Sequence, residues 1–206
     1  MIITRNDAAG SALFEATCIN DTSMVQTLLS TSDAQSYINY TDVDGRTPIF
    51  EAACNGQAAV VAKLIAASCG VNPVCDDDGS TPLHAAAYNG HAVVVTQFIA
   101  AGSNVDIALK TNGATPLHMV AQEGHESVTK QLIEVRCNVD LALKTNGETP
   151  LFTAAKKGHT VIVKQLIGAR CNVDLQTNSG VTTLYIAAYR GHASVTKQLI
   201  EARFRV

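Results

Sequence analysis

Six histidines and six cysteines are the side chains of this sequence that could bind a metal or act as nucleophiles. A zinc site on one helix needs two ligands about one turn apart, as in His-x-x-x-His, and no histidines have that spacing. No Cys-x-x-Cys pair occurs either, so neither a zinc ribbon nor a thioredoxin-type redox motif is indicated. The sequence therefore predicts neither a metal site nor a bound cofactor.

Catalytic motifs are also missing from the sequence. It contains no Gly-x-Ser-x-Gly, no P-loop and no paired-carboxylate motif. The acidic run of Asp76, Asp77 and Asp78 could hold a cation weakly. Because it stands directly before Gly79 in a turn-rich segment, a solvated turn is the simpler explanation. We therefore expect a protein that is not an enzyme and has no small-molecule substrate.

The amino-acid composition disfavours several other classes of protein. The chain has 206 residues, of which 47% are hydrophobic and 16% are charged, and the low charge disfavours a long coiled coil. The net charge of −3 does not support nucleic-acid binding through phosphates. No apolar run approaches the ~18 residues of a membrane span, and residues 1–10 lack the apolar centre of a signal peptide. The expected location is the cytoplasm or nucleus, away from membranes, where thiols stay reduced.

A repeated pattern sets the architecture. Glycine recurs every 34 residues and then once after 33, at Gly45, Gly79, Gly113, Gly147 and Gly180. Each of the first four is followed by x-Thr-Pro, and the fifth by Val-Thr-Thr. A second glycine lies eleven residues after each of them, and a histidine usually follows it, at His91, His125, His159 and His192.

Each part of the repeat has a physical role. Threonine before proline is a helix N-cap with proline at the first helical position, where its missing N–H costs nothing. The second glycine ends this short helix in the left-handed region. Apolar residues then recur at i, i+3, i+4 and i+7, which indicates a second helix. The segment rich in Asn, Asp, Thr and Gly before the next repeat is typical of a β-turn.

The segment Thr81–Ala86 reads Thr-Pro-Leu-His-Ala-Ala, and here the sequence resembles the ankyrin-repeat family. The resemblance covers residues 44–206. Residues 10–43 look like a diverged first repeat, because 13–18 (LFEATC) match 49–54 (IFEAAC). The resemblance implies an all-α solenoid of helix-turn-helix units with β-turn fingers, forming one domain over 1–206. The expected repeats are about 8–43, 44–77, 78–111, 112–145, 146–178 and 179–206.

One position departs from the family pattern. The family usually has glycine after the second helix, as at Gly102, but Ser68, Arg136, Arg170 and Arg203 stand there in other repeats. If those residues keep a left-handed backbone, each costs on the order of 1 kcal/mol.

The resemblance also implies the function, which is non-catalytic binding of another protein or peptide, as a scaffold, adaptor or inhibitor. In this family the binding surface is a concave face built from finger tips and the ends of the first helices. The corresponding positions vary here while the framework repeats, and Tyr and Arg among them are typical of binding hot spots. They are Asp44, Arg46, Asn55, Asp77, Asp78, Ser80, Tyr88, Asn89, Thr111, Asn112, Gln122, Glu123, Asn146, Glu148, Lys156, Lys157, Ser179, Tyr189 and Arg190.

Charge is distributed unevenly along the chain. Residues 1–103 carry 3 basic and 10 acidic side chains, whereas residues 104–206 carry 12 and 8. Lys130, Lys164 and Lys197 share one position on successive second helices, and stacking would align them. A solvated outer face, with Glu134 and Glu201 one turn after a lysine, is the simpler explanation. An acidic partner is the alternative.

Three further alternatives stay open. Asn72 holds a position that can be hydroxylated in ankyrin repeats, or it caps the finger. The identical segments 108–113 and 142–147 fit a designed or excised scaffold with no natural ligand, and they fit recent gene duplication equally well. The last repeat keeps interior-type residues such as Leu199 and Ile200, so excision from a longer array or self-association through the C-terminal end is expected.

We predict that all six thiols are free. The cysteines recur at framework positions and no secretion signal is indicated. A thiol titration of denatured protein that has not been reduced should find six reactive groups, and fewer would contradict the prediction.

Overall fold

The computed structural model describes residues 5–75 and 78–204. In this part of the chain the regular elements are twelve α-helices and one 3-10 helix, and β pairing is limited to the isolated bridges Cys75–Ser80 and Gln176–Thr182. The chain divides into two compact units, Met1–Asn104 and Val105–Val206, which are described separately. The all-α class is confirmed, and the single-domain organisation over 1–206 stays a prediction.

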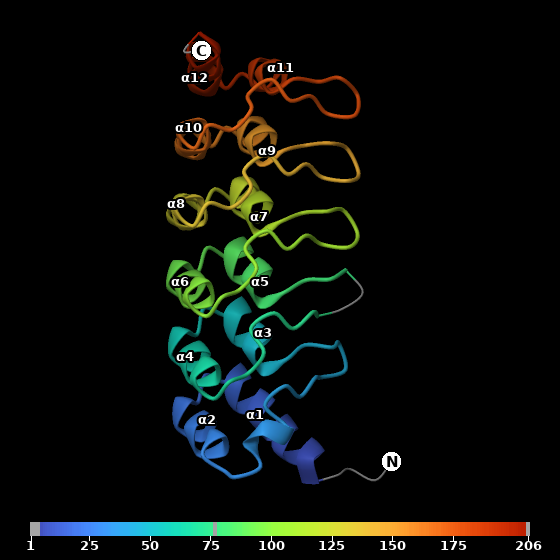
Figure 1. The fold of residues 1–206 in the computed structure, drawn as a ribbon, viewed down its shortest axis with the longest axis vertical. Coiled ribbons are helices and arrows are strands. Elements are labelled where there is room, and N and C mark those ends of the chain that lie inside the picture. Colours follow the sequence, from blue (N-terminus) through green and yellow to red (C-terminus); the bar gives the residue numbers. More distant parts are fainter. Residues whose placement is uncertain (1–4, 76–77, 205–206) are drawn as a thin grey trace. The chain divides into compact units, whose positions relative to one another are not determined.

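The first unit contains three helix pairs. These are α1 (Arg5–Cys18) with α2 (Thr22–Leu29), α3 (Pro48–Cys54) with α4 (Ala58–Ala66), and α5 (Pro82–Tyr88) with α6 (Ala92–Ala100). A short 3-10 helix, Ala34–Ser36, follows α2. The first helices α1, α3 and α5 pack in succession, and so do the second helices α2, α4 and α6, which gives two helical layers with the fingers projecting beside them (Figure 1).

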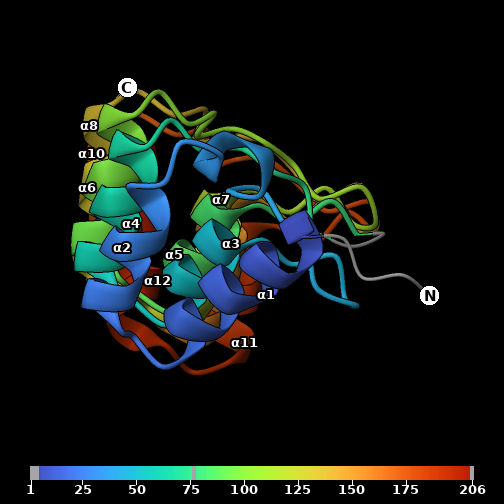
Figure 2. The ribbon, with the colours of Figure 1, turned by 90° about the horizontal axis from the view of Figure 1, so that it is seen from below.

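The second unit repeats this plan. Its pairs are α7 (Pro116–Glu123) with α8 (Glu126–Glu134), α9 (Pro150–Lys157) with α10 (Thr160–Gly168), and α11 (Thr183–Tyr189) with α12 (Ala193–Arg203). Again α7, α9 and α11 pack in succession, as do α8, α10 and α12. Seen from below, the fingers extend away from the layer of second helices (Figure 2).

Threonine begins the first helix of each pair from α3 onward, as predicted. The hydroxyls of Thr47, Thr149 and Thr182 accept the backbone N–H three residues on, at 3.1 to 3.3 Å. In α5 and α7 a histidine completes the cap, because His84 Nδ1 and His118 Nδ1 accept the backbone N–H of the capping threonine at 3.3 and 3.2 Å. Both rings are buried, which confirms their structural role.

A histidine also joins successive helix pairs. The ring Nε2 of the histidine after the second glycine donates to a backbone carbonyl of the preceding pair. The bonds are His91 to Cys54 at 3.0 Å, His159 to Gln122 at 3.1 Å and His192 to Lys156 at 3.2 Å. We call this contact the histidine lock.

The lock explains why glycine precedes the turn. Gly56, Gly124 and Gly158 have φ of +68°, +90° and +83°, in the region that favours glycine. A Cβ on any of them would also lie 2.6 to 2.8 Å from the ring of the following pair's histidine. Glycine is therefore required both for the backbone and for the space that the ring occupies.

Side-chain amides and carboxylates add further bonds between pairs. Gln97 Nε2 donates to Ala58 O at 3.0 Å, and Gln165 Nε2 donates to Glu126 O at 3.2 Å. In the loops, Asn or Asp accepts a backbone N–H from the next repeat, as Asn72 Oδ1 does from Asn104 at 3.3 Å. Asn72 thus has a structural role in the loop.

The left-handed positions after the second helices are occupied by larger residues, as the sequence suggested. Ser68, Arg136 and Arg170 have φ of +61°, +61° and +62°. Arg203 differs, because it is the last residue of α12 and its Nε donates to Asp174 Oδ1 at 2.8 Å. The expected strain therefore holds at three of the four positions and not at Arg203.

We predict that Arg136→Gly and Arg170→Gly each raise the free energy of unfolding by about 0.5–1 kcal/mol, because glycine adopts positive φ without the Cβ penalty. Urea denaturation measures the change. The control is Ala169→Gly, whose residue has φ of −79°, and which should lower stability. If the arginine variants are also destabilised, strain at these positions is absent.

Candidate protein-binding surface

In the described part of the chain, no three His, Cys, Asp or Glu side chains lie close enough together to hold a metal ion. No helix among the described residues has the length and apolarity to cross a membrane. Asp76 and Asp77 lie outside the described residues. Asp78 Oδ1 accepts the Ser80 N–H at 2.8 Å, which is a turn contact as predicted.

In the first unit, the candidate residues lie on the fingers and at the ends of α3 and α5. Arg46 from a finger and Asn55 from the end of α3 both reach Glu51, at 3.8 and 2.7 Å. Sequence reasoning did not select Glu51, although it organises this cluster. Asn89 donates to Ala85 O at 3.0 Å, and Asp44 and Tyr88 are exposed.

In the second unit, an ion pair joins a finger to α9. Lys156 Nζ lies 2.8 Å from Glu148 Oε1, and the two side chains are 34% and 14% exposed. Such partial burial makes the pair more rigid than a surface salt bridge. The adjacent Lys157 is exposed.

The most prominent feature of the second unit is an aromatic pair on α11. Tyr189 is 72% exposed and stacks on Tyr185, with ring centroids 6.0 Å apart and planes inclined by 10°. Arg190, which caps α11, is also exposed. Sequence reasoning selected Tyr189 and Arg190 but missed Tyr185, although the i, i+4 spacing of the two tyrosines signals the contact.

Several candidate side chains form hydrogen bonds within their own fingers. Asn112 Oδ1 accepts the Ala114 N–H at 2.9 Å, and Asn146 Oδ1 accepts the Glu148 N–H at 3.0 Å. The Ser179 hydroxyl lies 3.0 Å from that of Thr177. These residues shape the fingers, and the remaining exposed candidates are Thr111, Gln122 and Glu123.

The lysines on the second helices form weak ion pairs. Lys130 lies 3.8 Å from Glu134, and Lys197 lies 4.0 Å from Glu201, on exposed side chains one helical turn apart. These are the pairs that the sequence predicted, and pairs of this kind contribute little to stability. Lys164 is exposed as well.

Five of the cysteines have a raised pKa, whereas a reactive thiol has a lowered one. Burial raises the pKa of Cys69, Cys137 and Cys171 to about 12. Burial, and then the charge of Glu51, also raise the pKa of Cys18 and Cys54. A thiolate nucleophile is disfavoured at each of these positions.

Comparison with protein families decides the classification. A family model of ankyrin repeats in three copies matches residues 51–142, 83–172 and 117–206. The chain belongs to the ankyrin-repeat family. The matches begin in α3, so the pair α1–α2 lies before the matched residues. The pair packs on α3 and α4, and its assignment as a diverged first repeat stays a prediction.

A solved ankyrin structure supports the same fold. The crystal structure of the ankyrin repeat domain of Bcl-3, described as a unique member of the IkappaB protein family, is similar with a TM-score of 0.84. The similarity covers 93% of this chain and 85% of that one, at 19% sequence identity. At this identity the similarity supports the fold alone. A search of curated protein sequences found no match.

We predict that the cysteines of the folded protein differ in reactivity. At pH 8 iodoacetamide should modify the exposed Cys18 first and the half-buried Cys54 next. The thiolate is the form that reacts, and a buried thiol is less often ionised than an exposed one. The buried Cys69, Cys75, Cys137 and Cys171 should react slowly. Peptide mapping by mass spectrometry reads out the rates, and denatured protein, in which all six should react alike, is the control. Rapid modification of Cys171 in the folded chain would contradict the burial argument.

Proposed function

We propose that this ankyrin-repeat protein is a non-catalytic binding module that presents a preformed surface to another protein or peptide, as a scaffold, adaptor or inhibitor. Ankyrin repeats as a family mediate protein–protein interaction. The surface we propose consists of the finger residues and first-helix ends of each unit, the concave face of the family. The observation that carries the proposal is the exposed stack of Tyr185 and Tyr189 beside Arg190.

Exposed aromatic rings on a rigid helix are well suited to binding. Tyr189 presents an apolar face and a polar hydroxyl, and stacking on Tyr185 limits its freedom before a partner arrives. The helix itself is fixed by packing on α9 and α12 and by the Thr182 cap. Little conformational entropy is then lost on binding, so more of the contact energy appears as affinity.

The exposed cations indicate which chemical groups a partner would carry. Lys157 and Arg190 end successive first helices and have no ion-pair partner among the described residues, whereas Lys156 is paired with Glu148. A partner segment that places an apolar or aromatic side chain on Tyr189 and a carboxylate near Arg190 would fit this arrangement. We expect it to be met in the cytoplasm or nucleus.

The alternative is a designed or excised scaffold without a natural ligand. The identical segments 108–113 and 142–147 fit this alternative and recent gene duplication equally well. Screening cell extracts for a bound protein, with the variants below as controls, separates the two proposals. Self-association through α11 and α12 is a further expectation, which light scattering over a concentration series tests.

We predict that replacing Tyr189 and Arg190 together with Ala weakens partner binding by more than ~1 kcal/mol. Both side chains are exposed, so the free energy of unfolding should change by less than ~0.5 kcal/mol apart from the lost tyrosine stack. Isothermal titration with a captured partner measures the first effect, and urea denaturation measures the second.

The matched control is Lys130→Ala with Lys164→Ala, which removes exposed cations from the second helices of the same unit. These changes should leave affinity almost unchanged. If they abolish binding while the Tyr189 and Arg190 changes do not, the binding surface lies on the second helices.

A further inference from the structure

A groove of about 520 Å³ lies between the second helices α10 and α12 of the second unit. Lys164 and Ile167 of α10 and Lys197 and Ala202 of α12 are among the residues that line it. Both lysines are exposed and Ile167 is half-buried, so the groove has an apolar part and a lysine on each helix. Because the fingers extend away from the second helices, the groove is separate from the candidate surface on the fingers (Figure 2).

The first unit has a groove at the same repeat positions that lacks these two lysines. It lies between α2 and α4 and measures about 390 Å³. Gln26 and Ala62 stand there in place of Lys164 and Lys197. The cation that lines this groove, Lys63, donates to Gln26 Oε1 at 2.6 Å and is already bound. Packing of two second helices therefore forms the groove, and the side chains at these positions decide its charge.

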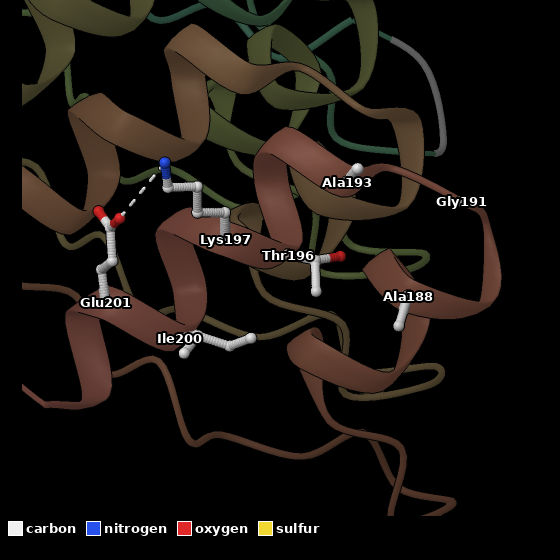
Figure 3. A pocket seen from close by; sticks show the side chains of 7 residues that line it. All are labelled: Ala188, Gly191, Ala193, Thr196, Lys197, Ile200 and Glu201. Carbon is white, nitrogen blue, oxygen red and sulfur yellow. Dashed lines mark ion pairs between the residues drawn. The ribbon is translucent and has the colours of Figure 1, made fainter.

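The two lysines of the second unit are available to a partner. Lys164 forms no ion pair among the described residues, and α10 (TVIVKQLIG) contains no acidic side chain. Lys197 Nζ lies 4.0 Å from Glu201 Oε1, and the two side chains are 78% and 48% exposed (Figure 3). Exposed pairs of this kind contribute little stability, so Lys197 can exchange Glu201 for a partner's carboxylate at small cost.

A further cation stands beyond the end of α10. Arg170 follows Ile167 by three residues, is exposed and forms no ion pair among the described residues. Its backbone has φ of +62°, a conformation that favours glycine. Strained residues of this kind are concentrated at functional sites. Binding through the guanidinium would give a reason for an arginine at this strained position.

We propose that the groove between α10 and α12 binds an acidic segment of another protein, in which an apolar side chain lies between carboxylates. The apolar side chain contacts Ile167, and the carboxylates pair with Lys164, Lys197 and Arg170. The argument is charge complementarity, because these cations have either no ion-pair partner among the described residues or the weak one that Glu201 provides. The site adds to the finger surface proposed above and does not depend on it.

A protein segment suits this groove better than a nucleic acid does. A phosphate backbone is bound mainly through charge, and the carboxylate of Glu201 beside Lys197 would repel each phosphate that approached. Glu134, one turn after Lys130 on α8, places a further anion on the second helices of this unit. A peptide can place its apolar side chain on Ile167 and direct its carboxylates away from these anions.

The test uses a synthetic peptide in which a leucine is flanked on both sides by glutamates. NMR titration of the isotope-labelled protein gives the dissociation constant and the location of the bound peptide. We expect the largest shift changes within residues 160–168 and 194–202, which contain the residues that line the groove, and small changes at the fingers. A peptide with glutamine in place of glutamate should bind much more weakly, because its charges are removed.

Reversing the charge of the groove should weaken binding of the glutamate peptide. Lys164→Glu with Lys197→Glu should raise the dissociation constant at least about tenfold, because each change replaces an attraction by a repulsion. A peptide with lysine in place of glutamate should bind this variant more tightly than it binds the parent chain. The matched control is Lys110→Glu with Lys144→Glu, which makes the same change in net charge on exposed finger residues. At physiological salt the control should change the dissociation constant by less than about twofold.

Arg170→Gly separates a loss of binding from a loss of folding. This change should raise the free energy of unfolding, as predicted above, because glycine adopts positive φ without strain. It should also raise the dissociation constant of the glutamate peptide about threefold, because one cation is removed. Weaker binding by a stabilised variant cannot be explained by unfolding.

The proposal is overturned if the glutamate peptide does not bind, if its shift changes lie on the fingers, or if the control weakens binding as much as the groove variant does. It is also overturned if an oligothymidylate binds more tightly than the peptide and loses affinity in the same lysine variant, since the site would then take a nucleic acid. None of these outcomes contradicts the finger surface, which the Tyr189 and Arg190 changes test separately.

Discussion

The left-handed glycine at the end of each first helix from α3 onward is the constraint on which the rest of the structure depends, and after α1 Asn20 holds this position with φ of +56°. The glycine turns the chain into the second helix, and its missing Cβ leaves the space in which the next repeat's histidine lies. At Gly158 a methyl group would meet the His192 ring at 2.7 Å, so one residue determines both the hairpin and its stacking. The histidine ring then donates a hydrogen bond to a backbone carbonyl at the end of the first helix, which would otherwise have only water as a donor.

Because this glycine recurs in every helix pair from α3 onward, the framework could be predicted from sequence. The threonine caps, the positive φ of the glycines, the burial of Cys69, Cys137 and Cys171 and the strained Arg136 and Arg170 all follow from position within the period. Arg203 departs from the pattern because Asp174 offers its side chain a partner, and α12 continues two residues further than the equivalent helix α10. Local competition of this kind is not visible in a repeat alignment.

The candidate binding surface could be predicted less well from the sequence than the framework. Variation between repeats separates framework from non-framework positions, but it does not tell which variable side chains point outward. Asn112 and Asn146 are candidate residues, yet their side chains accept hydrogen bonds within their own fingers, and Lys156 is paired with Glu148. The Tyr185–Tyr189 stack requires that Tyr185 is exposed. Its exposure depends on how the helices pack, and the repeat pattern does not indicate it.

Stability and recognition therefore use different side chains in this protein. The buried core contains no Asp, Glu, Lys or Arg among the described residues, so charge can change without disturbing the fold. The first unit carries a net charge of −7 and the second +4. At physiological salt, charges act over about 8 Å, so a partner responds to the nearest groups and not to the total. If a partner binds beside Tyr189, as we propose, the exposed Lys157 and Arg190 are the charges we expect it to meet.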